Sequence, residues 1–297
     1  MIGLFDSGAG GLTVMRALAE RFPDVDMLYF GDHANAPYGD RPADEVIALT
    51  QDGVRTLFEL GCRLVLLACN TATAVACRQL QQHWLPNTGY HGHNILGIVA
   101  PTVEAATQVP WAVTTPQYPQ KYNTETIGVF ATRRTVLSGV YPEEIGKRCP
   151  QVRVLQKACP TLVRGIEGDW PARDLTTAVE RYVAEMLDEA QSSDRGTPPE
   201  RVILGCTHYP LLEHAFRAAL PSTIRLLAQP QAVSDSLEDY LERHPHFATR
   251  AENARTRTIR LVTSGDPARP SDALHRFWPD IPAFEPLRER PSQVSNP

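Results

Sequence analysis

Two cysteines in this chain stand at the same kind of place, directly after an apolar run and directly before small polar residues. Cys69 follows the run 64–68 and precedes Asn70, and Cys206 follows the run 202–204 and Gly205 and precedes Thr207 and His208. Such runs are typical of strands buried on both faces of a parallel sheet. Polar groups just beyond the carboxyl ends of these strands lie where open α/β sheets bind ligands. The two thiols therefore predict a pair of acid/base groups at a ligand site.

A buried structural cysteine is the alternative for each thiol, because free cysteine is often a small core residue. The residues that follow favour chemistry, since Asn-Thr and Thr-His hydrogen-bond or titrate. A free thiol has a pKa of about 8.5, so a neighbouring group must help to form the thiolate. His208 is near enough in sequence to help Cys206, and Asp6, at another expected strand end, could reach Cys69. Thiols on opposite faces of one carbon could remove a proton from one side and deliver one to the other.

The stretch Asp6-Ser7-Gly8-Ala9-Gly10-Gly11 follows an expected strand and opens an expected helix. Backbone N–H groups at a helix start favour an anion. The spacing is not that of a dinucleotide site, and Asp6 would repel a pyrophosphate. A bound amino acid fits better, with its carboxylate on the N–H donors and its ammonium group near Asp6. A plain helix cap is the alternative. The turn Pro37-Tyr38-Gly39 is expected at the same sheet end, where an ordinary turn is equally consistent with the sequence.

The sequence argues against both a racemisation cofactor and a bound metal. Pyridoxal phosphate needs a Schiff-base lysine, and the lysines of the chain are Lys121, Lys147 and Lys157, none beside a recognisable phosphate loop. We therefore predict cofactor-free chemistry. The sequence has neither Cys-x-x-Cys nor His-Glu-x-x-His, and a zinc site would have to be assembled from a loop that carries His83, His91 and His93.

The elements that must position these groups are buried strands alternating with amphipathic helices. One such helix repeats apolar residues at helical spacing from Val46 to Phe58 and is expected to stop at Gly61. Alternating strands and helices predict an α/β protein with mostly parallel sheets covered on both faces. The expected strands are 2–5, 27–30, 63–68, 95–99, 127–130, 152–155, 202–204, 224–227 and 259–262.

A weak internal repeat sets Ile2-Gly3-Leu4-Phe5-Asp6-Ser7 over Ile127-Gly128-Val129-Phe130-Ala131-Thr132. The two cysteine-bearing strands then occupy corresponding places. We predict two similar doubly wound domains facing each other, with both thiols in the cleft between them. Segment 107–124 is predicted to be a surface insertion joining the halves, and the proline-rich stretch after Asp266 is predicted to be an extended tail.

Composition limits the class of protein. The chain has 297 residues, enough for two domains, with 42% hydrophobic and 21% charged residues. A net charge of −5 argues against a nucleic-acid partner. No apolar run approaches the ~20 residues of a membrane span, and the start Met1-Ile2-Gly3 does not resemble a signal peptide. The six cysteines form no disulfide framework. We predict a cytoplasmic protein with no membrane partner.

Several motifs, taken in order along residues 1 to 215, resemble the aspartate/glutamate racemase family and its glutamate-specific members most closely. They are Phe5-Asp6-Ser7-Gly8, Tyr29-Phe30-Gly31-Asp32, Pro37-Tyr38-Gly39, Ala68-Cys69-Asn70-Thr71-Ala72 and Gly205-Cys206-Thr207-His208-Tyr209-Pro210-Leu211. The resemblance implies two α/β domains related by pseudo-twofold symmetry, with the active site in the cleft between them. It also implies cofactor-free interconversion of L- and D-glutamate, which supplies D-glutamate for peptidoglycan.

The resemblance assigns roles to individual residues. Cys69 would take the α-proton of D-glutamate with help from Asp6, and Cys206 that of L-glutamate with help from His208. Glu167 would contribute electrostatically. The implied substrate-binding residues are Ser7, Pro37, Tyr38, Gly39, Asn70, Thr71, Thr132 and Thr207.

The resemblance further implies that the strands near 224 to 262 return to the first domain. The first domain is then predicted at 1–97 plus about 212–266, the second at about 98–211, and the tail at about 267–297. The turn Ala228-Gln229-Pro230 departs from the family, in which many members have Asp-Ser. Racemisation of aspartate or a hydantoin, a non-catalytic amino-acid-binding module and a homodimer all stay open.

Overall fold

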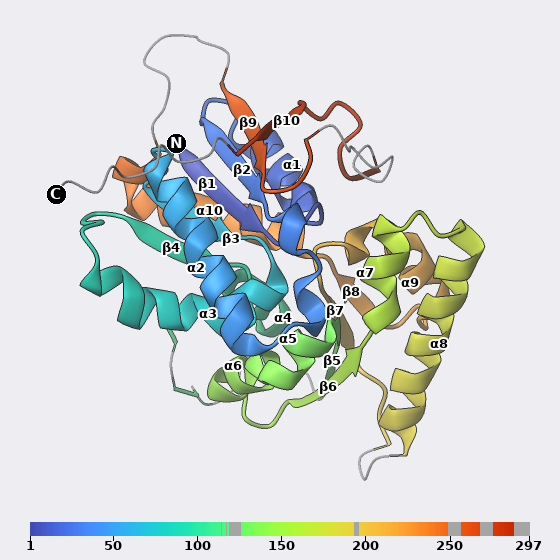
Figure 1. Ribbon diagram of the computed structural model, residues 1–297. Coiled ribbons are helices and arrows are strands. Elements are labelled where there is room, and N and C mark those ends of the chain that lie inside the picture. The colour runs from blue at the N-terminus through green and yellow to red at the C-terminus, as the bar shows by residue number, and fades with distance from the viewer. Residues whose placement is uncertain are drawn as a thin grey trace, which may run out of the picture.

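The computed structural model describes residues 1–113, 115–116, 118, 126–192, 196–248, 257–267 and 276–287, which form two parallel sheets. The first has the order β10-β9-β2-β1-β3-β4 and the second the order β6-β5-β7-β8. Both are visible in Figure 1, with the second sheet at the lower right. The strands of the first sheet are β1 (Ile2–Asp6), β2 (Met27–Gly31), β3 (Leu64–Leu67), β4 (Asn94–Gly97), β9 (Ile259–Thr263) and β10 (Phe284–Pro286). Those of the second are β5 (Thr126–Ala131), β6 (Arg153–Ala158), β7 (Arg201–Gly205) and β8 (Arg225–Leu227).

Helices cover both faces of the first sheet because alternate strand residues point to opposite sides. Leu4 of β1 belongs to a buried cluster with Met15 of α1 (Leu12–Arg21) and Leu237 of α10 (Gln229–Arg243). Its neighbour Phe5 belongs to a separate cluster with Val54 of α2 (Ala43–Glu59). Helix α3 (Asn70–Gln79) packs beside α2 on that second side. The predicted stop of α2 at Gly61 is met, since that glycine adopts a φ of 93°.

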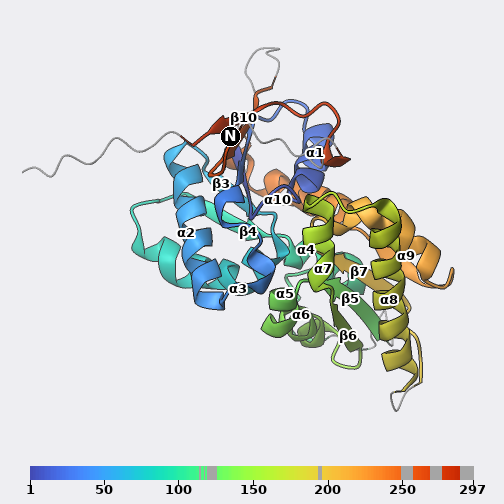
Figure 2. The same cartoon turned by 45° about the vertical axis from the view of Figure 1, so that its right-hand side comes forward.

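The second sheet is covered in the same way. On one face lie α7 (Pro160–Glu167), α8 (Ala172–Gln191) and α9 (Glu213–Ala219). On the other lie α4 (Val99–Thr107), α5 (Arg133–Ser138) and α6 (Val140–Arg148). Figure 2 shows α8 and α9 on the side of this sheet that faces away from the first. The predicted α/β class with parallel sheets covered on both faces is therefore confirmed.

The predicted internal repeat matches the strand order. The series β2-β1-β3-β4 in the first sheet corresponds to β6-β5-β7-β8 in the second. Strand β1 pairs with both β2 and β3, and its counterpart β5 pairs with both β6 and β7. The two thiol-bearing strand ends, after β3 and after β7, thus occupy equivalent positions.

One strand was expected in the wrong sheet. Residues 224–227 were predicted to pack on the first domain, but β8 pairs with β7 of the second sheet, Val202 lying opposite Leu226. The physical reason is the repeat itself, because β8 extends the sheet beyond β7 as β4 does beyond β3. Strand β9 does return to the first sheet, where it pairs with β2. The domain boundaries themselves stay a prediction.

Part of the proline-rich tail is folded. Strand β10 adds to the edge of the first sheet beside β9, and Phe284 packs its ring on Tyr29 and His33. Residues 268–275 and 288–297 of the predicted tail lie outside the described residues, as do Lys121 and much of the predicted insertion 107–124. Within the described part of the chain, no helix has the length and apolar character needed to cross a bilayer.

Candidate active site

Both cysteines begin the segment after a central strand, and both line one cavity. Cys69 lies between β3 and α3, where its sulfur caps the helix by accepting the Ala72 N–H at 3.5 Å. Cys206 directly follows β7. Each is 5% exposed, and the cavity that they share measures about 30 Å³. The structure thus brings the two thiols to one narrow site, as the equivalent strand ends predicted.

Every residue predicted to bind substrate lines this cavity: Ser7, Pro37, Tyr38, Gly39, Asn70, Thr71, Thr132 and Thr207. Among the predicted catalytic residues, His208 also lines it. Asp6 and Glu167 are not in the lining, but each contacts a residue that is. Cys159, which lies in a weaker match to the family at Ala158-Cys159-Pro160, and Val163, which the sequence did not single out, also line the cavity.

A histidine–carboxylate pair stands behind Cys206. His208 Nδ1 lies 3.8 Å from the Cys206 sulfur, and Nε2 lies 2.8 Å from Glu167 Oε1. Burial lowers the pKa of His208, but the hydrogen bonds to Cys206 and Glu167 outweigh it and hold the pKa well above the ordinary value. For Glu167 burial acts in the opposite sense and raises the pKa, but the hydrogen bond to His208 outweighs burial, so the pKa is lowered overall. The pair is therefore an imidazolium beside a carboxylate, and the Nδ1 of this imidazolium can donate toward the Cys206 sulfur.

Cys69 has a different environment. Its thiol donates to the Ser7 hydroxyl at 3.4 Å. Burial, reinforced by the charge of Asp6, raises the pKa of Cys69 to about 12, so this group is held as a neutral thiol near pH 7. The Asp6 carboxylate accepts hydrogen bonds from the Gly8 N–H at 2.9 Å and the Thr207 hydroxyl at 3.3 Å. Burial raises the pKa of Asp6 despite these bonds and the charge of His208. Asp6 thus influences Cys69 through its charge, and its assistance in proton transfer stays a prediction.

Three threonine hydroxyls join the two domains across the site. Thr71 of α3 lies 2.9 Å from Thr132 and 3.3 Å from Thr135, and the latter two are 3.0 Å apart. Thr132 also caps α5 by accepting the Thr135 N–H. Thr135 was missed as a site residue, although its position three residues after a capping threonine was a usable signal.

A buried carboxylate holds the turn Pro37-Tyr38-Gly39 in place. The Tyr38 hydroxyl donates to Asp32 at 2.6 Å, and the Asn35 amide and Ser264 hydroxyl donate to the same carboxylate. Burial and the Asp32 charge both raise the pKa of Tyr38, which keeps its phenol protonated. The turn is thereby fixed against the site.

Sequence reasoning also missed Gln229. This residue is 1% exposed and its side chain contacts Asn70, next to Cys69. The only available signal was the departure from the family pattern at Ala228-Gln229-Pro230, which gave no direction.

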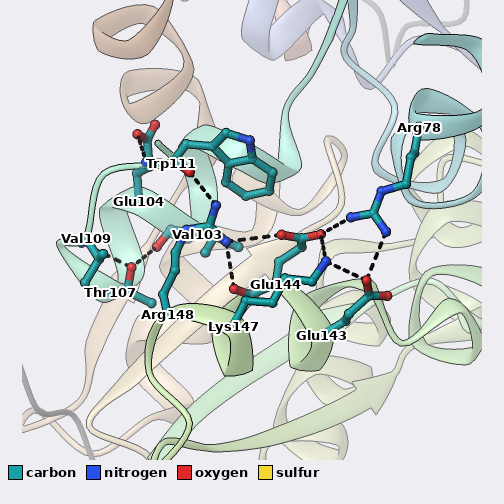
Figure 3. Close-up of polar contacts among 10 residues, drawn as sticks. All are labelled: Arg78, Val103, Glu104, Thr107, Val109, Trp111, Glu143, Glu144, Lys147 and Arg148. Carbon is teal, nitrogen blue, oxygen red and sulfur yellow. Dashed lines mark hydrogen bonds and ion pairs between the residues drawn. The ribbon is translucent and has the colours of Figure 1, made fainter. Parts of the chain in front are cut away.

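Helix α3 is tied to the second domain at its far end by charge. Arg78 donates to Glu143 at 3.0 Å and to Glu144 at 2.5 Å, and both carboxylates also contact Lys147, as Figure 3 shows. Glu144 is buried and has a third cationic partner, Arg148, at 3.1 Å. This cluster holds α3 against α6, opposite the end that Cys69 caps.

The geometry agrees with the comparison to known families. The model of the Asp/Glu/Hydantoin racemases matches residues 9–234. The chain belongs to this family. Among curated members, a glutamate racemase from Phenylobacterium zucineum is 45% identical over 96% of this chain and 99% of its own length. One from a Caulobacter species is 44% identical, with the same coverage. Among solved structures, a glutamate racemase isoform from Bacillus anthracis is 25% identical with a TM-score of 0.78, covering 97% of both chains.

Proposed function

We propose that this protein is a cofactor-independent glutamate racemase that interconverts L- and D-glutamate. The observation that carries the proposal is the pair of buried thiols, each at the end of an equivalent strand of two like sheets, that line one cavity. The curated relatives at 45% and 44% identity, which are named glutamate racemases, support the choice of substrate within the family.

The two thiols exchange roles between the two enantiomers. With L-glutamate, the Cys206 thiolate takes the α-proton, and the electron pair left on the carbon is delocalised into the adjacent carboxylate. The Cys69 thiol gives its proton to the opposite face, which yields D-glutamate, a Cys206 thiol and a Cys69 thiolate. With D-glutamate the same steps run in reverse. The raised pKa of Cys69 suits the donor role, because that sulfur keeps its proton until the carbanion forms.

His208 and Glu167 act on Cys206 together. A protonated His208 donates toward the Cys206 sulfur and stabilises its thiolate, while Glu167 keeps the imidazole protonated and fixes its orientation. Asp6 modulates the opposite thiol through its charge. The substrate carboxylates and ammonium group are held by the polar lining of the cavity, above all the hydroxyls of Ser7, Thr71 and Thr207 and the amide of Asn70.

The test is conversion in deuterated water without added cofactor. Purified protein is incubated with L-glutamate, L-aspartate and a 5-substituted hydantoin side by side, and the α-proton signal and enantiomer ratio are followed. We expect glutamate alone to lose its α-proton signal and become racemic. Preferential turnover of aspartate or the hydantoin would contradict the substrate, and no exchange with any of them would favour a non-catalytic binding module.

The biological role follows from the activity. D-glutamate made by this reaction would supply peptidoglycan synthesis. A cytoplasmic location and a homodimer remain predictions.

A further inference from the structure

Gln229 makes an unusually complete set of hydrogen bonds for a side chain that touches no reacting atom. Its Oε1 accepts from Asn70 Nδ2 at 2.5 Å. Its Nε2 lies within donating distance of Asn70 Oδ1 at 3.1 Å, Thr102 Oγ1 at 2.7 Å and the Tyr141 hydroxyl at 3.2 Å. The two side-chain amides thus face each other through two reciprocal hydrogen bonds.

The four residues come from four helices, two of which connect the two domains. Thr102 lies on α4, which carries the chain from β4 of the first sheet to the second domain. Gln229 begins α10, which carries it back from β8 toward β9 of the first sheet. Asn70 begins α3 of the first domain, and Tyr141 lies on α6 of the second. Both connections between the domains therefore meet at the residue next to Cys69.

The hydrogen bonds fix the orientation of the Asn70 side-chain amide relative to the cavity. Its Oδ1 accepts from Gln229 and from the Tyr141 hydroxyl at 2.8 Å, and one Nδ2 hydrogen is donated to Gln229. A side-chain amide has two such hydrogens, so one remains for the cavity that Asn70 lines. Removal of Gln229 would leave buried groups of Asn70 unsatisfied and free its amide to rotate.

We propose that Gln229 is a positioning residue, which fixes the Asn70 amide beside Cys69 and links its orientation to the placement of the two domains. The proposal rests on the proposed function. Helix α3 cannot easily shift to compensate, because its buried face packs in one cluster with Val54 of α2 and Arg78 adds ion pairs to α6 at its other end (Figure 3). A change at Gln229 therefore acts on the Asn70 side chain, and through it on the proton transfer at Cys69.

The test compares Gln229→Met with Gln231→Met. Methionine keeps the length of the glutamine side chain and removes its hydrogen bonds. Gln231 is the matched control, since it is an exposed glutamine two residues along the same helix, with a hydrogen bond to exposed Asp235. We measure kcat/KM and its isotope effect with α-deuterated D-glutamate and α-deuterated L-glutamate, together with the melting temperature of each variant.

We expect Gln229→Met to lower kcat/KM on the order of 10²-fold, the scale of a misplaced catalytic group. The loss is equal for both enantiomers, because the ratio of kcat/KM in the two directions equals the equilibrium constant, which is one for mirror-image substrates. The isotope effect should rise with D-glutamate, whose α-proton goes to Cys69, and fall with L-glutamate. A merely structural role would reduce the amount of active protein and leave both isotope effects unchanged, which would overturn the proposal, as would a variant that behaves like the control.

Two further measurements keep the test decisive. If Gln229→Met does not fold, Tyr141→Phe removes one hydrogen bond to Asn70 with the ring retained, and it should shift the isotope effects in the same directions. If the wild-type protein does not act on glutamate, the proposed function fails. A double-mutant cycle then tests separately whether Gln229 fixes the Asn70 amide. Non-additive effects of Asn70→Ala and Gln229→Met on the urea midpoint would then support it, and additive effects would overturn it.

Discussion

Replacing Glu167 by glutamine should separate the charge of His208 from its position. The carboxylate lies 2.8 Å from His208 Nε2 in a largely buried pair. A glutamine oxygen can still accept a hydrogen bond there, but the negative charge is gone. A hydrogen bond to a charged group contributes about 1.5–3 kcal/mol and one to a neutral group about 0.5–1.5 kcal/mol, so losing the charge should weaken this contact by about 1–1.5 kcal/mol and lower the pKa of His208.

The sign of the effect on activity follows from the role of the imidazolium. Protonated His208 supports the Cys206 thiolate, so kcat/KM should decline as pH rises through the pKa of His208. In Glu167→Gln this alkaline decline moves to lower pH, because the pKa of His208 falls. The assay is the pH profile of kcat/KM, supported by NMR titration of the His208 ring. Exposed Glu189, changed to glutamine, is the control. An unmoved profile and an unchanged His208 titration would refute the reasoning.

The same pair should leave a signature in stability. His208 has a raised pKa, so its contribution is complete below its ordinary value of 6.5 and is lost as pH rises through the folded value. Glu167 has a lowered pKa, so its contribution is complete above 4.5 and is lost as pH falls through the folded value. The destabilisation by Glu167→Gln should therefore be largest between pH 4.5 and pH 6.5, where both contributions are complete. Urea unfolding at several pH values can measure it.

Two further predictions concern backbone space and surface charge. Gly10→Ala would place a methyl group against the His208 ring, and displacing that ring should lower kcat/KM on the order of 10²-fold. Gly146→Ala on α6, which has open space around it, is the control and should leave activity unchanged. Steady-state kinetics can check both. Arg78→Gln should lower the free energy of unfolding by about 1 kcal/mol or less, because the side chain is 56% exposed, and the loss should shrink in high salt. Arg55→Gln, whose ion pair lies within α2, is its control, and a loss that does not depend on salt would contradict an electrostatic role.

The sequence predicted the central strands well because β2, β3 and β7 each contain a short apolar run. Strand β10 was missed because Phe284-Glu285-Pro286 is short, mixed and ends in proline, and only the edge of the first sheet makes it a strand. Strand β8 was found but assigned to the wrong sheet. The chain returns to the first sheet only after α10, at β9, and local sequence does not show where that return takes place.

The site was predictable where function depends on residues next to strand ends. Ser7, Asn70 and Thr207 each follow a strand or its cysteine, so their places in the cavity could be read from local order. Gln229 could not be found in this way, because its role arises from contacts with helices that lie far away in sequence. The hydrogen bonds of Asp6 to Gly8 and Thr207 were equally hidden, since neighbouring strand ends do not determine which groups a carboxylate contacts.

The central claim is that two thiols act on opposite faces of one carbon, and serine replacement tests it most directly. Wild type, Cys69→Ser and Cys206→Ser are each incubated with pure L-glutamate and pure D-glutamate in deuterated water. We predict that wild type racemises both and that each serine variant loses nearly all conversion. Conversion that persists near the wild-type rate in both variants would contradict the account.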